Sequence, residues 1–227
     1  MTTAHKLSSI IFDLDGTLID SAPGIISSFC KILHQAGISP TVTLNHSIIG
    51  PPLDKTLALL TGSSDSALLD TLAADFRNHY DHFGVLETRL FQGVSTLLEG
   101  LLEAGITLHI CTNKRQSPSA KILRNLGLDS NFVSLYALDM EQNRYNDKAS
   151  LLSAQIKDLS LDPTTTAYVG DTHADGTASY ANGIPFYYAA WGYGNTSRKN
   201  APIHWTWVDA PANLSNALSN QLRKPAK

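Results

Sequence analysis

Apolar and polar residues follow two different patterns along the chain. The apolar run at 8–14 is too short for a helix and rich in isoleucine, which predicts a buried strand. A segment with apolar residues at helical spacing follows and ends at Gly37, and the same spacing recurs at 53–60 and 68–83. No further strand is predicted before residue 89, so this part of the chain is predicted to be one strand followed by helices.

Beyond residue 90 the pattern changes, and strands and helices alternate. Strands are predicted at 106–112, 133–138, 165–170 and 184–189, and helices at 94–102, 117–126, 147–157, 173–182 and 211–222. Such alternation predicts an α/β fold, a doubly wound parallel sheet with helices on both faces. We therefore expect a core domain built from residues 1–18 and 90–227, with a small helical cap domain, residues 19–89, inserted after the first strand.

Composition and charge exclude several classes of protein. The chain of 227 residues is 43% hydrophobic and carries 17 Lys and Arg against 20 Asp and Glu, a net charge of −3. Without a basic cluster, no nucleic acid or anionic membrane partner is expected. Cys30 and Cys111 lie far apart and match no disulfide or zinc pattern. No apolar stretch has the length of a signal peptide core or a membrane helix, so a cytoplasmic location is expected.

Polar and acidic residues gather where the predicted strands end. Ligands of open parallel sheets bind beyond the carboxyl ends of the strands, so these residues are expected to meet at one edge. They are Asp13 and Asp15 after the first strand, Thr112 and Asn113 after the second, Asp171 after the strand at 165–170, and Lys148 and Asp175 on adjoining helices.

Four carboxylates at one edge require positive charge between them. A close pair of like charges costs on the order of 4 kcal/mol at an effective dielectric of about 20. A hard divalent cation with oxygen ligands removes this cost, and Mg²⁺ commonly binds one or two carboxylates together with a substrate phosphate. The sequence therefore predicts a Mg²⁺ site, and the charge of Lys148 with the hydroxyl of Thr112 suits a phosphate group.

Four motifs in this chain resemble those of a known superfamily. "DLDGTLIDS" at 13–21, "CTNK" at 111–114, Lys148 and "GDTHAD" at 170–175 are similar, in this order, to the signature motifs of the haloacid dehalogenase (HAD) superfamily. More narrowly, the chain resembles the phosphoglycolate phosphatase-like branch, also in "GPPL" at 50–53 and "WGYG" at 191–194. The resemblance implies a HAD-like Rossmannoid core with an inserted cap.

The resemblance also implies roles for individual residues. Asp13 is expected to attack phosphorus and become an aspartyl phosphate, while Asp15 protonates the leaving alcohol and then activates water. Asp13, Asp15 through its backbone carbonyl, and Asp171 are expected to ligate Mg²⁺. Asp175 is expected to orient Lys148 or a metal-bound water.

Substrate contacts follow from the same resemblance. Thr112 and Lys148 are expected to hold the transferring phosphoryl oxygens, with Arg144 as an alternative for the lysine. Asn113 is expected to contact the substrate, and Gly16 to leave space for its approach.

The predicted function is a Mg²⁺-dependent phosphomonoester hydrolase acting on a small soluble phosphate ester. Asp15 argues against a dehalogenase, which needs no proton donor, and nothing around Lys55 supports a phosphonate-cleaving Schiff base. 2-Phosphoglycolate is the leading substrate, with a nucleotide or a sugar phosphate as alternatives. A phosphosugar mutase and a non-catalytic phosphate-binding protein remain as alternative functions, and the sequence leaves monomer and homodimer open.

Overall fold

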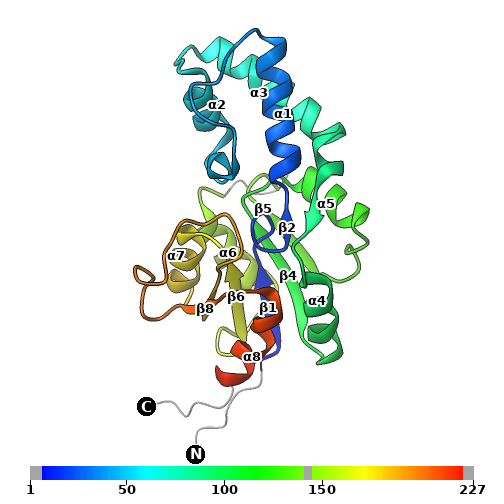
Figure 1. Cartoon of the computed structure of the whole chain (residues 1–227). Helices are drawn as coiled ribbons and strands as arrows, with labels where there is room; N and C mark the ends of the chain where they lie inside the picture. Colours follow the sequence, from blue (N-terminus) through cyan, green and yellow to red (C-terminus); the bar gives the residue numbers. More distant parts are fainter. Residues whose placement is uncertain (1–6, 141–144, 222–227) are drawn as a thin grey trace, which may run out of the picture. The chain divides into compact units, whose positions relative to one another are not determined.

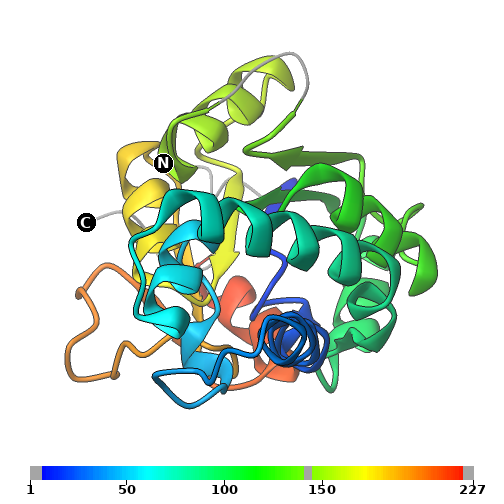
Figure 2. The same ribbon diagram turned by 90° about the horizontal axis from the view of Figure 1, so that it is seen from above.

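The computed structural model describes residues 7–140 and 145–221. The chain forms two compact units, one comprising Met1–Ile19 and Leu90–Lys227 and the other Asp20–Arg89. We call the first the core unit and the second the helical insert, and Figure 1 and Figure 2 show their elements in two views. Among the described residues, none of the helices combines the length and the apolar character that crossing a bilayer requires.

A six-stranded sheet with the order β5-β4-β1-β6-β7-β8 forms the centre of the core unit (Figure 1). Every neighbouring pair is parallel. The strands are β1 (Ser9–Phe12), β4 (Thr107–Thr112), β5 (Ser134–Ala137), β6 (Thr166–Gly170), β7 (Phe186–Ala189) and β8 (Thr206–Val208). The predicted parallel α/β fold is therefore confirmed, and β1 occupies the middle of the sheet.

Helices cover both faces of this sheet. They are α4 (Val94–Glu103), α5 (Gln116–Asn125), α6 (Lys148–Asp158), α7 (His173–Ala181) and α8 (Pro211–Gln221). The α6 and α7 helices pack on each other and share a buried cluster with Ile11 and Tyr168 of the sheet. Successive strand residues point to opposite faces, so the equally buried Ile10 and Phe12 face the side on which α4 and α8 pack together.

The helical insert has its own small core. It consists of α1 (Ala22–Gln35), α2 (Leu53–Thr61) and α3 (Ser66–His82), with short 3₁₀ helices η1 (His46–Ile48) and η2 (Gly84–Glu87). Phe29 of α1 stacks on Phe76 of α3 at 4.4 Å between ring centroids, and Phe76 stacks on Tyr80 at 5.6 Å. A side chain at Gly24 would overlap the backbone of Gly84, which explains how α1 approaches η2 so closely.

Three short strands were not expected from the sequence. β2 (Ile19–Asp20) and β3 (Arg89–Leu90) pair with each other where the chain leaves the core unit and returns to it. Two residues are too few to show any periodicity. β8 is three residues long and forms one edge of the sheet, where the polar and aromatic sequence around it carries no run of apolar residues.

Candidate active site

The carboxyl ends of three adjacent strands bring the predicted residues of the core unit together. β1 pairs with β4 and β6, so that Phe12 lies opposite both Ile110 and Val169. The next residue, Asp13, donates its backbone N–H to the carbonyl of Val169 at 2.8 Å. Asp171 follows the end of β6 directly, as Asp13 follows β1. The two carboxylates therefore emerge side by side from neighbouring strands.

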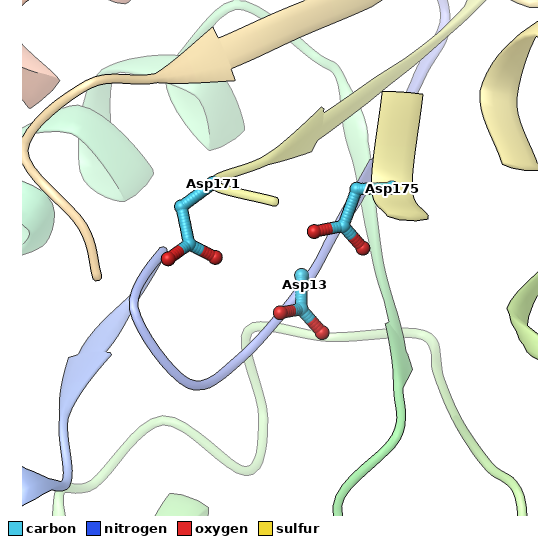
Figure 3. Close-up of side chains that lie close together, drawn as sticks. All are labelled: Asp13, Asp171 and Asp175. Carbon is cyan, nitrogen blue, oxygen red and sulfur yellow. The ribbon is translucent and has the colours of Figure 1, made fainter. Parts of the chain in front are cut away.

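Three of the aspartates form a buried cluster (Figure 3). Asp13, Asp171 and Asp175 each offer one carboxylate oxygen, and these oxygens lie within 4.8 Å of one another. All three side chains are buried, with exposed fractions of 7%, 1% and 2%. The amine of Lys148 lies 2.5 Å from Asp13 Oδ1 and 3.1 Å from Asp175 Oδ1, which gives the cluster one positive charge.

Local sequence determines where Lys148 lies. Asp147 caps the N-terminus of α6, because its carboxylate accepts a hydrogen bond from the Ser150 N–H at 2.8 Å and Ser150 reciprocates. The helix therefore begins at Lys148, whose side chain is 5% exposed. The prediction that this lysine reaches the strand ends agrees with this placement, and its rival Arg144 lies outside the described residues.

Asp175 is held by hydrogen bonds on both oxygens. It occupies the third position of α7, where Oδ2 accepts from the Thr172 N–H at 3.0 Å and from the Thr172 hydroxyl at 2.5 Å. Oδ1 accepts from the Tyr168 hydroxyl at 3.0 Å and faces Lys148. These contacts place Asp175 against Lys148, and its predicted role in orienting that lysine stays a prediction. Tyr168 was not predicted as a site residue, because it stands in an apolar strand and resembles a packing residue.

The carboxylate of Asp171 sits in a cradle of backbone groups. Its Oδ2 accepts from the N–H groups of Tyr193 and Gly194 at 2.8 and 3.1 Å, and its Oδ1 accepts from the Thr17 hydroxyl at 3.4 Å. The "WGYG" stretch therefore lies against the acidic cluster. These contacts leave Asp171 fixed in one orientation toward Asp13.

Two glycines leave room for this carboxylate. A side chain at Gly16 or at Gly192 would overlap the oxygens of Asp171. Gly16 also has a φ of +80°, which disfavours any residue with a Cβ. The Asp171 carboxylate thus lies where a Cβ of residue 16 would be, and the predicted role of Gly16 in leaving space for substrate stays a prediction.

Asp15 has a separate partner. Its two carboxylate oxygens lie 3.0 and 3.2 Å from the amine of Lys114, and the two side chains are 21% and 6% exposed. Its carboxylate is not among the three that cluster, so a role as metal ligand would fall to its backbone carbonyl. Lys114 was not predicted as a site residue, although it is the last residue of the "CTNK" motif.

The end of β4 presents Thr112 and Asn113 differently. Thr112 is buried, and its hydroxyl oxygen accepts a hydrogen bond from the backbone N–H of Lys114 at 3.1 Å. The hydroxyl proton therefore remains available to an acceptor such as a phosphoryl oxygen. Asn113 is exposed to solvent, and its predicted contact with substrate stays a prediction.

The negative charge of the aspartates in the site exceeds the positive charge of its lysines. Burial, with a smaller contribution from Asp175, raises the pKa of Asp13 to about 7 although Lys148 opposes the change. Burial and the neighbouring Asp13 raise the pKa of Asp171 to about 8. Burial opposes the charge on Lys148, yet Asp13 and Asp175 together raise its pKa. A site with oxygen donors and unbalanced negative charge fits a hard divalent cation.

The comparison with known families agrees with this geometry. An α/β core with an aspartate nucleophile candidate beside a buried lysine is the arrangement that the sequence motifs imply. The haloacid dehalogenase-like hydrolase family model matches residues 10–189. The chain belongs to this family of hydrolases.

Several individual proteins are similar to this chain over most of its length. A phosphoglycolate phosphatase of Xylella fastidiosa is 32% identical over 211 residues, which cover 91% of each protein. The tyrosine-protein kinase PtkA of Mycobacterium tuberculosis is 34% identical over 186 residues, 82% of this chain but only 62% of PtkA. A solved structure of PtkA superposes with a TM-score of 0.80 at 31% identity, over 94% of this chain and 99% of that one. The 5'-nucleotidase of Pseudomonas aeruginosa is 29% identical over 205 residues, 89% of this chain and 92% of the relative.

These findings confirm the resemblance drawn from the sequence. The chain is related to phosphatases of the HAD-like family, and its similarity to the Xylella enzyme extends over nearly the whole length of both proteins. With PtkA the chain shares less than two thirds of that protein's length.

Proposed function

We propose that this protein is a Mg²⁺-dependent phosphatase that hydrolyses a small soluble phosphate ester through an aspartyl phosphate on Asp13. The observation that carries the proposal is the buried Asp13 carboxylate, 2.5 Å from the Lys148 amine and clustered with Asp171 at the strand ends. Family membership and the similarity to the Xylella phosphatase support it. We place the activity in the cytoplasm, as the sequence predicts.

Asp13 and Asp15 carry out the two steps of the proposed reaction. An oxygen of Asp13 attacks phosphorus, the bond from phosphorus to the ester oxygen breaks, and Asp15 gives its proton to the departing alcohol. Asp15 then takes a proton from a water molecule that attacks the aspartyl phosphate. This second displacement releases inorganic phosphate and restores the Asp13 carboxylate.

The remaining residues of the site offset the charge of the phosphate and keep the reacting groups in place. Mg²⁺, when bound by Asp13, Asp171 and the backbone carbonyl of Asp15, supplies positive charge that offsets the charge of the phosphate. Lys148 and Thr112 hold the phosphoryl oxygens. We further propose that the helical insert acts as the cap that excludes water during the reaction.

2-Phosphoglycolate is the substrate that we propose first. Its support is the 32% identity to the Xylella phosphoglycolate phosphatase over 91% of both chains. A nucleoside monophosphate is the second candidate, because the 5'-nucleotidase relative is 29% identical over most of its length. PtkA is named as a tyrosine kinase, so phosphoryl transfer from ATP to a tyrosine peptide belongs in the same test.

The test is a panel of phosphate esters assayed for phosphate release with Mg²⁺ and with a chelator. The panel contains 2-phosphoglycolate, nucleoside monophosphates, sugar phosphates and a bisphosphorylated sugar, together with ATP and a tyrosine peptide. We expect chelator-sensitive release from one class and none from the Asp13→Asn variant. Isomerisation without release would indicate a mutase, and binding without turnover would indicate a non-catalytic protein.

A further inference from the structure

The ion pair between Asp15 and Lys114 stands apart from the rest of the site. Lys148 faces Asp13 and Asp175, whereas Lys114 faces Asp15 with both carboxylate oxygens within 3.2 Å. The lysine side chain is only 6% exposed. A buried ammonium group is costly unless a partner compensates it, so its position next to Asp15 requires a local cause.

The cause is a short turn at the end of β4. The Thr112 hydroxyl accepts a hydrogen bond from the Lys114 backbone N–H two residues further on, a turn that Ser and Thr side chains commonly form. At the start of α5, the Gln116 N–H donates to the Asp139 carboxylate at 2.7 Å. The backbone on both sides of Lys114 is therefore anchored, and the turn directs its side chain back toward the loop after β1.

Lys114 also contributes to the charge balance of the site. When all four aspartates of the site are ionised they carry four negative charges, and its two lysines carry two positive ones. The two remaining negative charges equal the charge of one divalent cation.

We propose that Lys114 is a positioning residue for Asp15, a proposal that rests on the proposed phosphatase function. The ammonium group holds the carboxylate in one place, so that Asp15 can transfer its proton to the leaving oxygen with little reorganisation. In this role Lys114 acts through Asp15 rather than on the phosphoryl group. Its removal should therefore impair the steps in which Asp15 transfers a proton, and kcat/KM isolates the first of them.

Substrates with different leaving groups distinguish a positioning role of Lys114 for Asp15 from a general effect on activity. The alcohol of 2-phosphoglycolate is a poor leaving group that needs a proton, whereas p-nitrophenolate departs with little assistance. The parameter kcat/KM reports the steps up to departure of the leaving group. For Lys114→Met we expect kcat/KM to fall about tenfold to a hundredfold with the alkyl ester that the wild type hydrolyses, and less than about threefold with p-nitrophenyl phosphate.

Four further variants complete the experiment: Lys114→Arg, Lys157→Met, Asp15→Asn and the double variant of Asp15→Asn with Lys114→Met. Lys114→Arg keeps the charge and should recover most of the activity lost with the alkyl ester. Lys157→Met removes an exposed lysine of α6 and should leave kcat/KM unchanged with both substrates. In an Asp15→Asn background, Lys114→Met should cause no further loss with the alkyl ester, because a residue that acts through Asp15 has nothing left to act on.

Each contrary result has a definite meaning. An equal fall with both substrates, or a full additional loss in the Asp15→Asn background, would show that Lys114 acts on the phosphoryl group or on the fold and would overturn the proposal. Unchanged kcat/KM with the alkyl ester would overturn it as well. A wild-type protein that releases phosphate from no ester would instead refute the phosphatase function, which separates the two failures.

Discussion

The hydroxyl of Tyr168 donates a hydrogen bond to Oδ1 of Asp175 at 3.0 Å, inside the core unit and fully shielded from water. The same carboxylate oxygen faces the amine of Lys148 at 3.1 Å. A tyrosine on β6 therefore helps to fix an aspartate on α7, which in turn faces the lysine beside Asp13. The chain of contacts extends from the interior of the sheet to the candidate nucleophile.

Replacing Tyr168 with Phe should lower turnover without unfolding the protein. A buried hydrogen bond to a charged group contributes about 1.5–3 kcal/mol, and its loss leaves Asp175 less firmly held. We expect kcat to fall about tenfold, measured as phosphate release at saturating substrate. Tyr187→Phe, which removes the hydroxyl of another buried tyrosine on β7, is the matched control and should retain normal turnover. Equal losses in both variants would contradict the assigned role.

Asp13→Asn and Lys148→Met should have opposite effects on stability although both abolish turnover. Removing Lys148 leaves Asp13 and Asp175 without their shared partner, and breaking a buried pair in this way costs about 3–5 kcal/mol. Removing the charge of Asp13 instead relieves repulsion within the cluster. We expect the melting temperature in chelator to fall for Lys148→Met and to stay level or rise for Asp13→Asn. A large loss of stability in Asp13→Asn would mean that the cluster is not charge-strained.

Much of this site was predictable because of where its residues lie along the strands. Asp13 and Asp171 each follow a buried apolar strand, and parallel strands bring such ends together. Lys148 could be placed near them because it begins the helix that returns to β6. In each case a short-range pattern and one rule of topology were sufficient.

The contacts of Lys114 and Tyr168 were not predictable in the same way. Lys114 meets a partner 99 residues away, and only the turn geometry after β4 aims it there. Tyr168 lies in a strand that is buried at every position, so no alternation of polar and apolar residues shows which face its hydroxyl points to. The strand β8 was missed because three residues at a sheet edge are too short to form a pattern.

Gly192→Ala should impair the metal site. The added methyl group would overlap the Asp171 carboxylate and the carbonyl of Gly16, so the carboxylate must leave its backbone cradle. We expect Mg²⁺ affinity to fall at least about tenfold, because misplacing supporting groups commonly costs that much. The measurement is titration of Mg²⁺ against activity or melting temperature. Gly100→Ala on α4, where nothing lies near the added atom, should bind Mg²⁺ normally and gain about 0.5–1 kcal/mol of stability.

Mg²⁺ should stabilise the protein more at pH 8 than at pH 5.5. The folded state raises the pKa of Asp13 to about 7 and that of Asp171 to about 8, above the unfolded value of 3.8. The folded protein therefore holds more protons than the unfolded chain between these values, so without metal its stability is greatest at low pH and declines as the pH rises toward 8. Mg²⁺ must displace those protons to bind, and the displacement becomes easier over the same interval.

The test compares melting temperatures with Mg²⁺ and with chelator across pH 5.5 to 8. The difference should widen as the pH rises, and Mg²⁺ addition near pH 7 should release protons that a weakly buffered solution registers. Asp171→Asn removes one titrating ligand, so in this variant the difference in melting temperature between Mg²⁺ and chelator should be small at every pH. A difference that is constant with pH in the wild type would show that Mg²⁺ does not bind these two carboxylates. In that case the excess negative charge of the cluster would be neutralised by protons alone.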